Sequence, residues 1–285
     1  MKHIVTIIIL IVIFGCKPKG NITSTSEVKS STIQEVKEIV TYLASDELEG
    51  RSTGSEGIEK AAVFIENKLK SYGVKPYFDT YRDTYLANDM DAFNVVGAVE
   101  GNDPYLKNEV IILGAHYDHI GFGKIVENDS IANGANDDAS GVAAVMAMSR
   151  YFAENKSNKR TIIFALYSGE EMGLLGSRHL AQRLKNDNIN LYTMISFEMI
   201  GVPFKDRDYK AFLSGFELSN MASKLNEYSG SNLIGLSELS KKYNLFKRSD
   251  NYPFYEAFKL PSHTISSCDL SNYDYYHHVN DESDQ

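Results

Sequence analysis

Two segments of the sequence are apolar at nearly every position: EVIILGA at residues 109–115 and TIIFALY at residues 161–167. A strand with one side in water alternates apolar and polar residues, so these two strands are expected to be buried on both faces. Residues 191–199 and 261–266 are predicted as two further buried strands, and residues 94–99 as a short one. A sheet built from such strands needs helices covering both of its sides.

Helical patterns separate the predicted strands. From Thr32, apolar residues recur at three- and four-residue steps, and a second helix is predicted over residues 57–71. Residues 140–152 and 176–184 are expected to be helices as well, whereas residues 203–245 give no clear assignment. The sequence therefore predicts an α/β fold, with a central, mostly parallel (mixed), twisted sheet and helices on both faces.

The first residues have the pattern of an export signal. Lys2 precedes an apolar run, Ile4–Phe14, which is interrupted only by Thr6 and is too short to cross a bilayer as a mature helix. The segment Ile13–Cys16 resembles a bacterial lipobox, so residues 1–15 are expected to be a lipoprotein signal peptide and Cys16 to carry the lipid. The alternative is an uncleaved N-terminal anchor. Both interpretations predict an exported domain held at the bacterial cell envelope, in the periplasm or at the outer surface.

Composition limits the remaining part of the chain. Residues 16–31 are polar and are predicted to form a flexible tether, leaving residues 32–285 as one domain. If Cys16 is lipidated, Cys268 is the only other cysteine, and no intrachain disulfide forms. The net charge of −9 argues against nucleic acid as a partner, because phosphate binding needs clustered Lys and Arg. No oligomeric state is indicated, and a monomer is assumed.

Imidazoles and carboxylates follow the predicted buried strands. In open α/β sheets, ligands bind beyond the carboxyl ends of the strands, so these side chains are expected to converge. Buried carboxylates repel one another unless a cation lies between them, and His with Asp or Glu is a ligand set that suits zinc. The candidates are His116, Asp118, Asp137, Glu170, Glu171, Glu198, Tyr276 and His277.

Each of these motifs taken alone has an ordinary structural explanation. The Asp137–Asp138 pair is compatible with a helix N-cap, and Asp138 is expected to be only that. The Glu170–Glu171 pair is compatible with a solvated helix start. It is their order, each after a predicted strand, that indicates a metal site. The absence of cysteine from the set excludes a thiolate-type structural zinc site.

Three further segments carry a family resemblance: YLASDELEGRSTGSEGIEKAAVFI near the start, FNVVGAVEG, and RSDNYPF near residue 250. Together with the candidates above, they resemble the co-catalytic zinc aminopeptidases, the group that includes bacterial leucyl aminopeptidases, glutamate carboxypeptidase II and glutaminyl cyclases. The resemblance extends from about residue 40 to the end of the chain. It implies the phosphorylase/hydrolase-like architecture of zinc exopeptidases and an aminopeptidase that removes N-terminal residues from peptides.

The resemblance also implies two Zn²⁺ ions and a ligand for each position. Asp137 would bridge the two ions. His116 and Glu198 would complete the shell of one ion, and Glu171 and His277 that of the other. Glu198 stands where many relatives have Asp, so its longer side chain changes the reach of this ligand.

Three more roles are implied. Glu170 would be the general base, and Tyr276 would hydrogen-bond the tetrahedral intermediate. Asp118 would fix the ring of His116 from behind, as outer partners of ligating imidazoles do. Relatives continue into a further helix after the segment that matches Asp281, which would make this chain shorter than they are at the C-terminus.

Several alternatives stay open at this point. A glutaminyl-peptide cyclase uses the same scaffold with a single zinc, but its relatives place Trp around the metal, and this chain has none. A carboxypeptidase or dipeptidase of the same family and a non-catalytic binding module are the others. Among neighbouring residues, His119 and His278 are expected to be spare or to lie behind the ligands. His179 and Asp250 are expected to pack or organise loops, and Arg51 to contact substrate or form a structural salt bridge.

Overall fold

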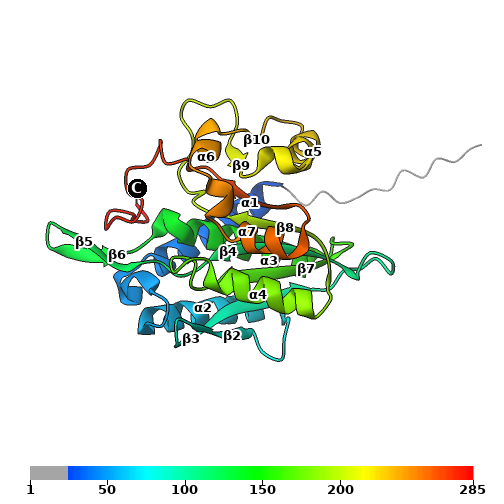
Figure 1. Cartoon of the computed structure of the whole chain (residues 1–285), viewed down its shortest axis with the longest axis horizontal. Coiled ribbons are helices and arrows are strands. Elements are labelled where there is room, and N and C mark those ends of the chain that lie inside the picture. The colour runs from blue at the N-terminus through cyan, green and yellow to red at the C-terminus, as the bar shows by residue number, and fades with distance from the viewer. Residues whose placement is uncertain (1–24, 285) are drawn as a thin grey trace, which may run out of the picture.

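The structure is a computed structural model that describes the backbone of residues 25–284 and the side chains from residue 33 onward. Its centre is a mixed nine-stranded sheet with helices on both faces (Figure 1), which confirms the predicted fold class. A separate two-stranded hairpin projects from one side. Among the described residues, no helix combines the length and the apolar character that crossing a membrane requires.

The strands run in the sheet order β1-β3-β7-β4-β8-β11-β9-β10, with β2 paired to β3. Four neighbours, β7, β4, β8 and β11, are parallel, and antiparallel pairs flank them. The carboxyl ends of these four strands therefore lie at one edge of the sheet. The strands are β1 (Lys75–Pro76), β2 (Arg82–Ala87), β3 (Met90–Val99), β4 (Glu109–His116), β5 (Gly121–Val126), β6 (Asp129–Ala132), β7 (Thr161–Tyr167), β8 (Asn190–Phe197), β9 (Ala211–Leu213), β10 (Ile234–Gly235) and β11 (Ser262–Ser266).

Three helices pack on one face of the sheet and two on the other. The helices are α1 (Thr25–Leu43), α2 (Glu56–Tyr72), α3 (Ser140–Asn155), α4 (Leu175–Asn186), α5 (Met221–Ser229), α6 (Glu238–Lys242) and α7 (Asn251–Phe258). Helix α2 ends as its sequence predicts, because Gly73 takes the left-handed conformation and its N–H bonds to the last-turn carbonyls.

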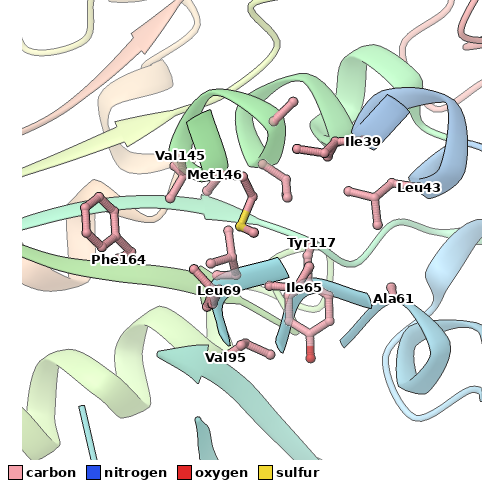
Figure 2. Close-up of a cluster of buried hydrophobic side chains, with 14 of the residues drawn as sticks. Ile39, Leu43, Ala61, Ile65, Leu69, Val95, Tyr117, Val145, Met146 and Phe164 are labelled. Atoms are coloured by element: carbon pink, nitrogen blue, oxygen red, sulfur yellow. The ribbon is translucent and has the colours of Figure 1, made fainter. Parts of the chain in front are cut away.

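Side chains alternate between the two faces along each central strand. On the first face, Val95 and Phe164 pack with α1, α2 and α3 around Met146 (Figure 2). On the second, Val96 and Ile163, the sequence neighbours of Val95 and Phe164, pack with α4 and α7. Because successive strand residues point to opposite faces, a strand apolar at every position serves both cores. This explains why the central strands show no polar alternation.

The structure also corrects some expectations. Helix α1 begins at Thr25 rather than at Thr32, so residues 25–31 are helical where a tether was expected. Extending a packed helix backward by two turns costs less than nucleating one, which accounts for the difference. Residues 203–245 contain β9, β10, α5 and α6; β9, β10 and α6 are too short to show a period, and α5 buries only Ala222. The predicted signal peptide and Cys16, the predicted site of lipidation, lie outside the described residues.

Candidate metal centre

The predicted ligands lie at the carboxyl edge of the parallel strands. His116 is the last residue of β4, Glu170 and Glu171 follow β7, and Glu198 follows β8. Asp137 lies in the turn Ala135–Ala139 that leads into α3. Since β4 lies between β7 and β8 in the sheet, the polar residues after these strands come together at its end.

Five of the candidate atoms make close contacts. The structure brings ligand atoms of His116, Asp137 and Glu171 within 4.8 Å of one another. His116 Nε2 is 3.3 Å from Asp137 Oδ1. His277, from the C-terminal loop, places its Nε2 2.9 Å from Glu171 Oε2 and 3.5 Å from Asp137 Oδ2. The two oxygens of Asp137 thus face different imidazoles, the arrangement that a bridging carboxylate would need.

Several buried polar atoms here have no hydrogen-bond partner among the described residues. They are His116 Nε2, both ring nitrogens of His119, Asp137 Oδ2, Glu171 Oε1 and Glu198 Oε2. An unpaired buried polar group costs on the order of 1–3 kcal/mol, so a cluster of them is costly for a protein built only to be stable. Nitrogen and carboxylate lone pairs that converge without donors fit a divalent cation of the zinc type.

Charge and burial act against each other in the cluster. Burial opposes protonation of His116, but the carboxylates of Glu170, Asp118 and Asp137 raise its pKa well above the ordinary value. Burial alone would raise the pKa of Glu171, but the imidazoles of His119 and His277 hold it below the ordinary value. For Glu198, burial dominates and raises the pKa to about 7. A positive charge is therefore favoured at this centre.

Asp118 acts through its backbone as much as through its side chain. The Nδ1 atom of His116 is 3.1 Å from the carbonyl oxygen of Asp118 and 3.7 Å from its carboxylate. The carboxylate instead accepts hydrogen bonds from Thr53 Oγ1 and from the backbone N–H of Glu170. Asp118 therefore links the strand end that carries His116 to the loop that carries Glu170.

Two other aspartates hold the ligand-bearing loops. Asp138 Oδ1 accepts from the N–H groups of Gly141 and Met199, which joins the start of α3 to the loop after β8. Asp281 accepts from the N–H groups of Asn136 and Asp137 at 2.7 and 3.0 Å. Asp138 thus occupies a helix start, as expected. The sequence gives no sign of this role of Asp281, because Asn136 and Asp137 are more than 140 positions away.

A cavity of about 50 Å³ opens beside the cluster, lined among others by Asp137, Glu170, Glu198, Arg248 and Tyr276. The ring of Tyr276 stacks on that of His277 with centroids 4.0 Å apart. Burial raises the pKa of the Tyr276 hydroxyl above its ordinary value, which keeps it a proton donor. Among the described residues that line this cavity, Arg248 is the only Lys or Arg.

Arg51 binds backbone carbonyl groups in the protein interior. Arg51 is fully buried and donates hydrogen bonds to the carbonyls of Leu43, Tyr117, Asn133 and Gly134. It has no ion pair among the described residues, so both earlier interpretations of Arg51 are wrong. The four carbonyls need a donor with several N–H groups, and guanidinium supplies them.

His179 packs against Tyr85 and contacts Asp83, away from the cluster, as expected. His278 accepts a hydrogen bond from the backbone N–H of Asn280 and stacks near Tyr275. Asp250, in the loop before α7, is buried, and burial raises its pKa to about 7. His119 differs from all of these, because it lies inside the cluster.

The sheet order and a carboxylate–imidazole cluster at its carboxyl edge define an α/β fold with a candidate metal centre. The chain belongs to peptidase family M28: the model of that family matches residues 94–285, more than half of the chain. This confirms the family that the sequence motifs indicate. The family model begins at residue 94, so it does not cover the N-terminal helices α1 and α2.

Relatives of known sequence or structure agree with this assignment. A probable zinc metalloprotease of Pyrenophora teres f. teres is 30% identical over 196 residues, covering 65% of this chain and 39% of the relative. The LapA aminopeptidase of Legionella pneumophila shares the fold with a TM-score of 0.68 and 21% identity, covering 96% of this chain and 71% of that one. A glutaminyl cyclase of Porphyromonas gingivalis shares it with a TM-score of 0.63 and 16% identity, covering 88% and 90%.

Proposed function

We propose that this protein is a zinc-dependent aminopeptidase that binds two ions and removes residues from the N-terminus of peptides. The observation that carries the proposal is the convergence of His116, Asp137, Glu171 and His277, with unpaired buried lone pairs facing one another. One ion would be held by His116, Asp137 and Glu198, and the other by Asp137, Glu171 and His277. When bound, such ions supply an acidified water and stabilise developing negative charge.

Glu170 is proposed as the general base. Its carboxylate lines the cavity beside the ligands, and its backbone N–H is fixed by Asp118. It would accept a proton from the attacking water on one carboxylate oxygen and pass it to the leaving amine. The hydroxyl of Tyr276, which also lines the cavity, would donate a hydrogen bond to the oxygen of the tetrahedral carbon.

The charge of the cavity favours the N-terminal end of a peptide. Asp137, Glu170 and Glu198 line the cavity, and a carboxylate-rich wall attracts a protonated α-amino group. Arg248 at the wall is available to a carboxylate further along a short substrate.

The test is a substrate panel on purified protein with and without a chelator. Leu-p-nitroanilide and short peptides report aminopeptidase activity, N-blocked peptides report carboxypeptidase activity, and Gln-peptides report cyclisation. We expect hydrolysis of free N-terminal substrates only, abolished by the chelator and restored by Zn²⁺. Cyclisation without hydrolysis would replace this proposal by the cyclase, and an inactive, zinc-loaded protein would favour a binding module.

The cellular place of this activity is a second part of the proposal. The lipobox-like segment ending at Cys16 supports an exported enzyme held at the cell envelope by a lipid. Peptides outside the cytoplasm would then be its substrates.

A further inference from the structure

His119 lies among the proposed ligands although its place in the sequence suggested no role. Its side chain is buried, and its Nδ1 is 3.0 Å from Glu171 Oε1 and 3.9 Å from Asp137 Oδ2. Its ring meets the ring of His277 edge-on, with centroids 5.6 Å apart. His119 and His277 therefore approach the same two carboxylates.

Another buried histidine shows how an imidazole is normally satisfied in this fold. His263 is also 1% exposed, and both of its ring nitrogens have partners at 2.8 Å, the carbonyl of Ser214 and the hydroxyl of Ser219. Neither ring nitrogen of His119 has a hydrogen-bond partner among the described residues. The 3.0 Å approach to Glu171 thus lacks the alignment of a hydrogen bond, and a packing role leaves the polarity of this ring unexplained.

The distances match the edges of a zinc tetrahedron. With bonds of about 2.0–2.1 Å, neighbouring ligand atoms of a tetrahedral zinc lie about 3.3 Å apart. The distances from the carboxylates to His119 are 3.0 and 3.9 Å, and those to His277 are 2.9 and 3.5 Å. His119 approaches Glu171 Oε1 and His277 approaches Glu171 Oε2, and both face Asp137 Oδ2, so both imidazoles lie within ligand distance of the same pair of carboxylates.

The position of the ring is fixed by packing. A Cβ atom added to Gly134 would come within 2.6 Å of His119 Cγ, so this glycine lets the imidazole lie against the backbone. The backbone N–H of His119 bonds to the carbonyl of Arg51 at 3.3 Å. Contacts from two other loops therefore hold the ring toward Glu171 without help from a metal.

We propose that His119 is the fourth protein ligand of the ion held by Asp137, Glu171 and His277. This inference rests on the two-ion site proposed above. Four protein ligands close a zinc site, whereas three leave a position open for water. The two ions would therefore differ: the one beside His119 is retained tightly and organises the centre, and the one beside His116 keeps the open position.

The test counts metal ions rather than turnover, so it stands apart from the test of the peptidase. Zinc-loaded protein is equilibrated with buffers of decreasing free zinc, and bound zinc per chain is measured by atomic emission. The parent should lose its two ions in two separate steps. In His119→Ala, the affinity of the tightly held ion should fall by more than about 100-fold, beyond the usual effect of changing an outer partner.

Two variants make the comparison specific. In His119→Asp, the carboxylate oxygens are bonded to Cγ, as Nδ1 is in histidine. This variant should therefore recover most of the lost affinity for zinc. His179→Ala removes an imidazole outside the cluster and should leave both steps unchanged. Absorption spectra of the cobalt-substituted proteins report the ligand set directly and should differ between the parent and His119→Ala.

A loss smaller than about 100-fold, or identical cobalt spectra, would overturn the assignment and leave His119 as a residue that positions Glu171. Circular dichroism shows beforehand whether each variant is folded. If His119→Ala does not fold, His119→Asp decides alone: two retained ions with an altered cobalt spectrum support the ligand, and an unaltered spectrum refutes it.

Discussion

At the scale of single residues, Arg51 and Glu170 show two opposite uses of a charged side chain. The guanidinium of Arg51 is buried and joins the end of α1 to the loops after β4 and β6 through four backbone carbonyls. Glu170 borders the cavity and is not one of the proposed metal ligands. Arg51 thus supports the site from behind, whereas Glu170 is proposed to act on the substrate.

Replacing Arg51 by Lys should destabilise the protein although the charge is kept. A single ammonium cannot reach four carbonyls in different directions, so buried acceptors lose their donors. We expect a loss on the order of 3 kcal/mol in the free energy of unfolding, measured by urea denaturation. Lys60→Ala, which loses one hydrogen bond at the surface, is the control. Equal stability of Arg51→Lys and the parent would contradict this account.

Glu170→Gln should separate metal binding from turnover. The amide keeps the shape of the side chain but cannot accept a proton, so turnover should fall by about 100- to 10,000-fold. Because Glu170 is not a proposed ligand, zinc content should stay at the parent value. Measured together, turnover and zinc per chain test the assignment, and activity close to that of the parent would mean that another group is the base.

At the scale of helices and strands, Asp83 ties the edge of the sheet to α4. Its buried carboxylate on β2 contacts Arg183 at 2.6 Å and His179 at 3.2 Å, both on α4, and accepts a hydrogen bond from Asn94 on β3. Burial raises the pKa of Asp83, but the contacts with His179, Asn94 and Arg183 outweigh it, and the pKa is lowered.

Asp83→Asn should therefore be less stable than the parent at neutral pH, by on the order of 3 kcal/mol, since one partner of a buried charged network is lost. The folded pKa lies below the unfolded value, so the stabilisation by Asp83 is complete above an unfolded pKa of about 3.9. It disappears as the pH falls through the folded pKa. Urea denaturation from pH 7 to pH 2.5 should show the two proteins converging in acid; a constant difference would rule out the ionised carboxylate as its source.

At the scale of the whole molecule, the metal centre joins segments that are far apart in the chain. The ligands extend from β4 to the loop after β11, and Asp281 binds the turn of Asp137 from near the C-terminus. A cation at this point would therefore stabilise the folded state as a whole, because the unfolded chain has no such site.

Removing the metal should lower the melting temperature. Zinc in about 1,000-fold excess over its dissociation constant adds roughly 4 kcal/mol to folding stability. For a chain of this size that corresponds to a drop of about 10 °C with chelator, followed by differential scanning calorimetry. In the variant Asp137→Asn, the drop in melting temperature on adding chelator should be smaller. An unchanged melting temperature would argue against a bound cation.

Cys16→Ser should release the protein from the membrane. Lipidation on this cysteine would add a strongly apolar anchor, and the serine hydroxyl cannot take its place. In detergent phase separation of cells that express the full chain, the parent should enter the detergent phase and the variant the aqueous phase. Cys268→Ser is the matched control, and equal partitioning of all three would remove the proposed anchor.

The fold class and the candidate metal-binding side chains could be named from the sequence because they depend on local pattern and chemistry. Apolar composition indicates buried strands at residues 109–115 and 161–167. The residue types that bind zinc include those of His116, Asp137, Glu171 and His277. The short elements between residues 203 and 245 were missed: three of them have two to five residues and show no period, and α5 has only nine residues.

The sequence by itself therefore determined which strands are buried, which side chains can hold a metal, and where along the chain they occur. Only the tertiary structure decided that Asp281 supports Asp137, that Arg51 binds carbonyls, and that His119 faces Glu171. The physical reason is that a hydrogen bond or a ligand contact acts over about 3 Å of space, whatever the separation in sequence. The path of the chain, which sets those distances, exists only after the sheet has formed.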